Sequence, residues 1–131
     1  MVVIVAAALA LAGCGADPED EGGSASGTPP VSIEGTVNDR GTKTATDRFE
    51  VELDDFYFGP TYIKATPGQR FTIELRNEGD APHTFTIPGV DEEVQPGGRR
   101  TVTVTAPQSG FVVVTCRFHV AQGMQGAIFV A

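Results

Sequence analysis

The sequence lacks three features that would indicate another kind of fold or partner. It has no segment of convincing helical periodicity, which argues against an α-helical domain. It has no apolar run of the roughly 20 residues that a membrane-spanning helix needs. It also lacks an excess of positive charge, since 17 Asp and Glu residues outnumber 9 Lys and Arg residues. This acidic balance argues against nucleic acid as a partner.

The longest apolar run lies at the start of the chain, from Met1 to Ala12. Its length suits the hydrophobic region of a signal peptide, which is about 7–15 residues long. The run ends in Leu11-Ala12-Gly13-Cys14, which resembles the lipobox of bacterial lipoproteins and implies cleavage that leaves Cys14 as a lipid-carrying N-terminus. A plain signal peptide, with Cys14 present by chance, is the alternative. No Lys or Arg precedes the run, so we expect the natural chain to begin upstream.

A change of composition divides the rest of the chain. Residues 14–46 are rich in Gly, Ser, Pro and acidic residues, and such a segment buries too little surface to offset the entropy lost on ordering. We therefore predict a signal peptide at residues 1–13, a flexible membrane tether at residues 14–46 and one domain at residues 47–131. A weak pattern from Val31 to Val37 leaves an added edge strand open. The domain has about 85 residues, enough for one small core, and we expect a monomer.

The domain consists of short segments in which apolar and polar residues alternate, separated by turn residues. The predicted strands are Phe49–Leu53, Phe56–Phe58, Tyr62–Ala65, Arg70–Asn77, His83–Ile87, Arg99–Thr105, Phe111–Thr115 and Ala127–Val130. Pro67 and Gly68 occupy the central positions of a predicted type II turn, and Asp91-Glu92-Glu93 is interpreted as a solvated loop. Short antiparallel strands without a crossover helix favour an all-β fold, a Greek-key β-sandwich of about seven to eight strands.

One loop near the C-terminus carries three side chains that bind soft or borderline metal ions. Cys116, His119 and Met124 lie within nine residues, between two apolar strand-like segments. A second imidazole, His83, shares the apolar face of an earlier segment with Phe85. A lone histidine there is more often a hydrogen-bonded core residue, but a thiolate, two imidazoles and a weak thioether together are the ligands of a blue-copper electron-transfer site. If Cys14 is lipidated, Cys116 has no partner for an internal disulfide, and a metal thiolate fits it better.

Over roughly residues 49–131 the chain is similar to the cupredoxins of the plastocyanin-like group. The matching motifs are Pro82-His83-Thr84-Phe85 and Cys116-x2-His119-x4-Met124, followed by Gly126 at the last strand. This resemblance implies a β-sandwich that binds one copper ion, cycling between Cu(I) and Cu(II), at one end. It implies His83, Cys116 and His119 as the strong ligands and Met124 as the weak axial ligand. Many relatives have Asn where this chain has Thr84, so we expect the Thr84 hydroxyl to bond the loop near Cys116 instead.

The resemblance also implies how the protein exchanges electrons. In the family, the histidine of the ligand loop lies near the surface, inside an apolar patch where partners dock. His119 is therefore the expected electron gateway to redox protein partners. The expected protein is not an enzyme. It is exported and anchored by lipid on Cys14, on the outer face of the cytoplasmic membrane or in the periplasm.

Other functions are weaker or remain open. A copper oxidase or nitrite reductase needs more ligands than the two histidines of this chain, and a dinuclear centre like that of cytochrome oxidase subunit II needs two cysteines on the loop. A periplasmic or cell-surface copper chaperone or storage lipoprotein is the main alternative, because the same residues bind Cu(I). A metal-free interaction domain, with Cys116 as a small buried hydrophobe, leaves the ligand spacing unexplained.

Overall fold

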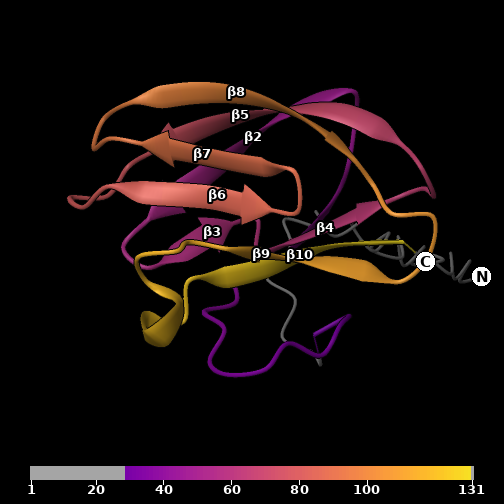
Figure 1. Cartoon of the computed structure of the whole chain (residues 1–131), viewed down its shortest axis with the longest axis horizontal. Helices are drawn as coiled ribbons and strands as arrows, with labels where there is room; N and C mark the ends of the chain where they lie inside the picture. Colours follow the sequence, from indigo (N-terminus) through magenta and orange to yellow (C-terminus); the bar gives the residue numbers. More distant parts are fainter. Residues whose placement is uncertain (1–28, 131) are drawn as a thin grey trace, which may run out of the picture.

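The computed structural model describes residues 29–130, which form two β-sheets packed face to face (Figure 1). In chain order the elements are β1 (Thr42–Thr44), β2 (Arg48–Asp54), β3 (Tyr57–Gly59), β4 (Tyr62–Ala65), β5 (Arg70–Asn77), β6 (His83–Ile87), β7 (Val90–Val94), β8 (Arg99–Thr105), β9 (Phe111–Thr115), the 3-10 helix η1 (Val120–Gln122) and β10 (Gln125–Val130). The predicted all-β Greek-key sandwich is confirmed, with ten strands in these residues in place of seven to eight.

Two predictions concern the membrane. The signal peptide at residues 1–13 and the lipidation site Cys14 lie outside the described residues and stay predictions. Within residues 29–130, no helix is long and apolar enough to cross a membrane.

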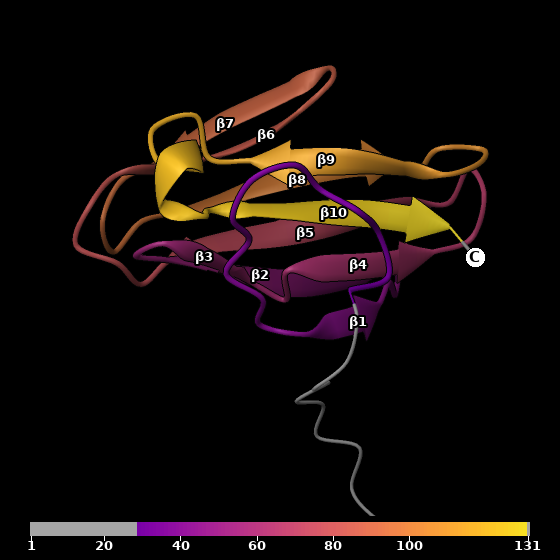
Figure 2. The same ribbon diagram turned by 90° about the horizontal axis from the view of Figure 1, so that it is seen from below.

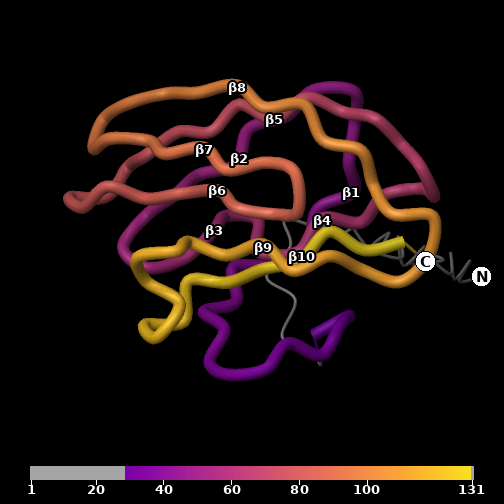
Figure 3. Tube along the Cα trace, viewed as in Figure 1, coloured from indigo at the N-terminus to yellow at the C-terminus, as the bar shows by residue number. Residues whose placement is uncertain are grey.

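The order of the strands determines which loops meet. The larger sheet has the order β1-β4-β10-β9-β6-β7, and the smaller sheet has the order β3-β2-β5-β8. β9 lies between β6 and β10 and is antiparallel to both. The end of β9 therefore meets the beginnings of β6 and β10 at one end of the sandwich, as can be followed along the trace in Figure 3.

The alternation in the sequence reappears in the buried faces of the strands. β5 has the predicted bounds, and its core-facing side chains are Phe71, Ile73 and Leu75. The predicted turn before β5 is also present, because the Gln69 N–H donates to the Thr66 carbonyl at 3.0 Å and Gly68 has a φ of 70°. A positive φ at this position is what a type II turn requires.

Two edge strands were missed by the sequence interpretation. The acidic segment Asp91-Glu92-Glu93 is not a loop but part of β7, which pairs with β6. Acidic residues are depleted in strands, yet an edge strand tolerates charges that face solvent, and here Val94 of the same strand is fully buried. β1 was missed because all three of its residues are exposed and show no alternation.

Residues 29–41, here called the N-terminal strap, cross the outer face of the larger sheet over β4 and β10 (Figure 2). They form no strand. Apolar strap side chains pack on apolar side chains of the sheet: Val31, Ile33 and Val37 on Tyr62, Ala127 and Phe129. The predicted tether at residues 14–46 therefore overlaps packed structure in its C-terminal part, since the strap covers apolar surface that β4 and β10 would otherwise expose to water.

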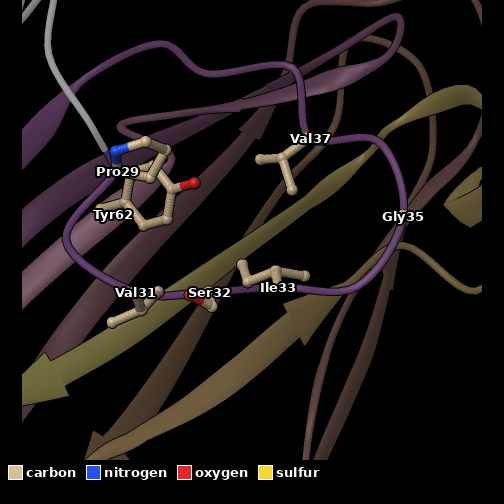
Figure 4. A pocket seen from close by; sticks show the side chains of 7 residues that line it. All are labelled: Pro29, Val31, Ser32, Ile33, Gly35, Val37 and Tyr62. Atoms are coloured by element: carbon tan, nitrogen blue, oxygen red, sulfur yellow. The ribbon is translucent and has the colours of Figure 1, made fainter.

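A pocket of about 360 Å³ remains beneath the strap, with Tyr62 as its floor (Figure 4). Its walls come from strap residues, among them Val31, Ile33 and Val37. None of the predicted metal ligands lines it, so this pocket is separate from the centre described next.

Candidate metal centre

Three of the four predicted ligands converge at the end of the sandwich where β6, β9 and β10 meet. The Nδ1 atoms of His83 and His119 lie 3.2 Å apart, and the Cys116 Sγ lies 3.8 Å and 3.4 Å from them respectively. All three donor atoms lie within 4.8 Å of one another. Within residues 29–130, this is the one group of three or more His, Cys, Asp or Glu residues placed to hold a metal ion.

Three of the four predicted ligands lie at the ends of strands, and His119 lies on the loop between β9 and β10. His83 is the first residue of β6, and Cys116 directly follows β9. Met124 directly precedes β10, is fully buried, and belongs to the same apolar cluster as Cys116. Two backbone hydrogen bonds close the loop between them, from Cys116 N–H to Met124 O at 3.1 Å and from Met124 N–H to His119 O at 3.2 Å. The fourth predicted ligand therefore lies beside Cys116 and His119.

The loop itself is held by η1 and by the N-terminal strap. Gly123 directly follows η1 and has a φ of 90°, a left-handed conformation that favours glycine. Asn38 of the strap donates its backbone N–H to Gly123 O at 2.9 Å and its side-chain amide to Gln122 O at 2.8 Å. The same amide also donates to Phe56 O at 2.8 Å, in the turn between β2 and β3. Asn38 thus ties the ligand loop to that turn, a role that no sequence pattern predicts.

The thiol and the start of the loop are fixed to β6 through Thr84. Its backbone N–H points at the Cys116 Sγ at 3.4 Å. Its side-chain hydroxyl accepts the Arg117 N–H at 2.9 Å, so the expected bond between Thr84 and the loop is present. The Arg117 guanidinium in turn bonds the Asp91 carboxylate of β7 at 2.9 Å. The ligand loop is therefore anchored to two neighbouring strands as well as to its own.

One residue of the centre has no counterpart in the sequence interpretation. The Asp55 carboxylate, in the turn between β2 and β3, lies 2.8 Å from the Nε2 of the fully buried His83. An ionised carboxylate can only accept hydrogen bonds, so this contact favours the tautomer of His83 that carries the proton on Nε2 and leaves the Nδ1 lone pair facing Cys116 and His119. Nothing in the sequence links Asp55 to His83, because the contact depends on how the two sheets pack.

The charges of this pair suit metal binding. The pKa of His83 is lowered, chiefly because burial disfavours the imidazolium, although the Asp55 hydrogen bond opposes this effect. The pKa of Asp55 is also lowered, first by the hydrogen bond from the Asp80 backbone and further by His83, against desolvation. The neutral imidazole is the form that coordinates a metal, so His83 needs to lose no proton before binding.

His119 lies nearer the surface, among apolar side chains. It is half-buried, and the Phe56 ring packs against its imidazole with 4.5 Å between ring centroids. Its loop neighbours Phe118 and Val120 are exposed, at 44% and 39% of their surface. The centre therefore has one histidine deep in the core and one at an apolar surface.

The chain matches the family described as "Cupredoxin-like domain" over residues 2–130. No curated protein sequence matches the chain. Among solved structures, a reduced auracyanin from the photosynthetic bacterium Roseiflexus castenholzii has 23% identity and a TM-score of 0.56, covering 66% of this chain and 98% of that chain. Auracyanin A from Chloroflexus aurantiacus, a "blue" copper protein, has 19% identity and a TM-score of 0.53, and the match covers 70% of this chain and 100% of that chain.

A chain of a heme-copper terminal oxidase dimer is also similar, with 24% identity and a TM-score of 0.54, covering 79% of this chain and 78% of that chain. At these identities, the similar structures establish the fold alone. The donor atoms suit the metal of a cupredoxin-like domain. A thiol, two imidazole nitrogens and a buried thioether at one end of the sandwich fit one copper ion.

The hydrogen bonds of Thr84 give a first testable prediction. Thr84→Val keeps the shape of the side chain but leaves the Arg117 N–H without its acceptor. We expect the free energy of unfolding of the metal-free chain to fall by about 1–3 kcal/mol, measured by urea denaturation. Thr86→Val is the matched control, because its half-buried hydroxyl bonds only Thr84 and Asp91 side chains. Equal losses of unfolding free energy in the two variants would contradict the role of Thr84 as the acceptor that holds Arg117.

Proposed function

The chain belongs to the cupredoxin-like domain family, and we propose that it is a mononuclear blue copper protein that transfers single electrons between redox partner proteins. His83, Cys116, His119 and Met124 are the proposed ligands. The observation that carries the proposal is the convergence of three donor atoms within 4.8 Å at one end of the sandwich. Bound copper would supply a one-electron Cu(I)/Cu(II) couple at this position.

The protein's contribution is a ligand set that is arranged before the metal arrives. Both histidines already direct Nδ1 toward the Cys116 sulfur, and the loop is closed by backbone hydrogen bonds on either side of Met124. A trigonal set of two imidazoles and one thiolate, with a weak thioether, serves both oxidation states. Ligands held by rigid strands and a hydrogen-bonded loop need little rearrangement when an electron is gained or lost.

The arrangement favours a carrier over an oxidase or a metal-free domain. The chain has two histidines in all, and both face one centre, so none is left for a second copper centre or a trinuclear cluster. A metal-free domain would have no use for three convergent donor atoms buried or half-buried at the sheet end. A copper chaperone or storage protein uses the same donors, and redox behaviour separates it from a carrier.

The proposed function is tested on the purified chain carrying Cys14→Ala, so that Cys116 is the only thiol. After one equivalent of Cu(II) is added, we expect an intense visible absorption band, narrow copper hyperfine splitting in the EPR spectrum and reversible one-electron voltammetry. Adding Cys116→Ser abolishes the band, because the serine hydroxyl cannot replace the thiolate. A colourless, weakly bound Cu(II) would refute the blue-copper centre, whereas tight Cu(I) binding without reversible cycling would support the chaperone.

We further propose that redox partners dock on the apolar surface around His119. Phe118 and Val120 are exposed beside this half-buried histidine, and exposed apolar patches mark interaction sites. Among the three residues whose donor atoms converge, His119 is the one that is not fully buried, so this surface gives a partner access to the centre.

Electron self-exchange between two copies of the copper-loaded chain tests this surface without a known partner. Phe118→Asp places a charge in the patch, and we expect the self-exchange rate measured by NMR line broadening to fall about tenfold, an effect of about 1.4 kcal/mol. Phe111→Asp is the matched control, since Phe111 has 42% exposure against 44% for Phe118 but lies at the far end of β9. A similar fall in both variants would point to overall charge and not to docking at His119.

Export and membrane attachment are the last part of the proposal. They rest on the apolar run and on the Leu11-Ala12-Gly13-Cys14 motif. We expect the N-terminal peptide of the protein purified from bacterial membranes to begin at Cys14 and to carry lipid, as read by mass spectrometry. Cys14→Ser is expected to release the protein from the membrane fraction, and an unmodified Cys14 in the mature protein would contradict the anchor.

A further inference from the structure

The turn between β2 and β3 reaches the centre from the opposite sheet. Its residue Asp55 bonds the Nε2 of His83 at 2.8 Å, on the side of the imidazole that faces away from Cys116 and His119. His83 is fully buried, whereas the Asp55 side chain is 27% exposed. The carboxylate therefore closes the centre on its outer side and places a negative charge one imidazole ring away from the donor atom.

The Asp55 carboxylate lies in a cradle formed by the loop before β6. One oxygen accepts the Asp80 backbone N–H at 3.0 Å, and the oxygen that bonds His83 also faces the Ala81 N–H at 3.4 Å. The buried Asn77 shapes this loop, because its side chain accepts the Gly79 N–H at 2.8 Å and donates to Ala81 O at 2.9 Å. The loop thus presents two backbone N–H groups that bind a carboxylate at this position.

Gly79 shows that the contact between Asp55 and His83 constrains the sequence. A Cβ atom at position 79 would lie 2.3 Å from the Asp55 Oδ1 and 2.8 Å from the His83 Nε2. Gly79 does not have a positive φ, so its backbone conformation does not demand glycine. The space that a side chain would take is the space that this hydrogen bond occupies.

We propose that Asp55 is a positioning residue that holds His83 with Nδ1 free for copper, and that its negative charge favours Cu(II) over Cu(I) and so lowers the reduction potential. The proposal rests on the proposed copper function. A carboxylate on the outer nitrogen of a ligating imidazole fixes the tautomer and raises the basicity of the ligand. A neutral acceptor in the same place would fix the tautomer but would supply no charge.

Two variants separate the two roles. Asp55→Asn retains an acceptor oxygen but removes the charge, so the Nε2–H tautomer should persist while the preference for Cu(II) falls. Gly79→Ala keeps the charge but displaces the carboxylate from His83, so both tautomers should be populated. The control for the charge is Asp54→Asn, which removes a carboxylate from the last residue of β2, directly before the turn. Asp54 bonds Tyr57 and the Asp55 N–H but not His83.

The charge role is measured by voltammetry of the copper-loaded chains. In Asp55→Asn we expect the preference for Cu(II) over Cu(I) to fall about tenfold. This fall raises the reduction potential by about 59 mV for a one-electron couple. Asp54→Asn should shift the potential by much less. A shift in Asp55→Asn no larger than that in Asp54→Asn would overturn the charge role.

The positioning role is measured on the metal-free chain, by the ¹⁵N shifts of its two imidazoles and by calorimetric titration with Zn(II). In Gly79→Ala we expect mixed His83 tautomers and a Zn(II) affinity about tenfold below that of the parent chain. Parent-like shifts and affinity would overturn the positioning role. If the parent chain formed no blue centre, the proposed function would fail, while these two measurements, neither of which uses copper, would still decide whether Asp55 positions His83.

Discussion

Burial of polar atoms at one end of an apolar sandwich is the constraint on which the rest of this structure depends. Removing an imidazole or a thiol from water destabilises the folded state unless its polar atoms find hydrogen-bond partners. Within residues 29–130, every buried side-chain nitrogen or oxygen has a hydrogen-bond partner. The partners of the centre come from elements far apart in the chain: Asp55 from the turn between β2 and β3, Thr84 from β6, and Asn38 from the strap.

This constraint explains why the centre can be rigid although three of its four proposed ligands lie on a loop. The loop after β9 is fastened at Cys116 and Arg117 to Thr84 of β6, and at Gly123 to Asn38 of the strap. Hydrogen bonds to two other segments restrict the loop without any contribution from a metal. Such restriction is what a carrier needs, because rearrangement of ligands during electron transfer would slow it.

The sequence predicted what local patterns determine. Alternation with a period of two locates β5, β6 and β8, and the spacing of Cys116, His119 and Met124 locates the ligand loop. The sequence did not predict the features that depend on packing between segments far apart in the chain. β7 is acidic because it is an edge strand, the strap is ordered because β4 and β10 are apolar on their outer face, and Asp55 reaches His83 across the sheets. None of these contacts leaves a periodic signal in the residues that make it.

The N-terminal strap has a consequence for how the protein folds. Gln125, at the start of β10, donates its side-chain amide to the strap carbonyls of Glu34 and Thr36, 91 and 89 residues earlier. Contacts between such distant segments make folding slow, because the chain must close long loops before it gains them. A nascent chain that still lacks β10 therefore also lacks the partner that holds Glu34 and Thr36 of the strap on the sheet.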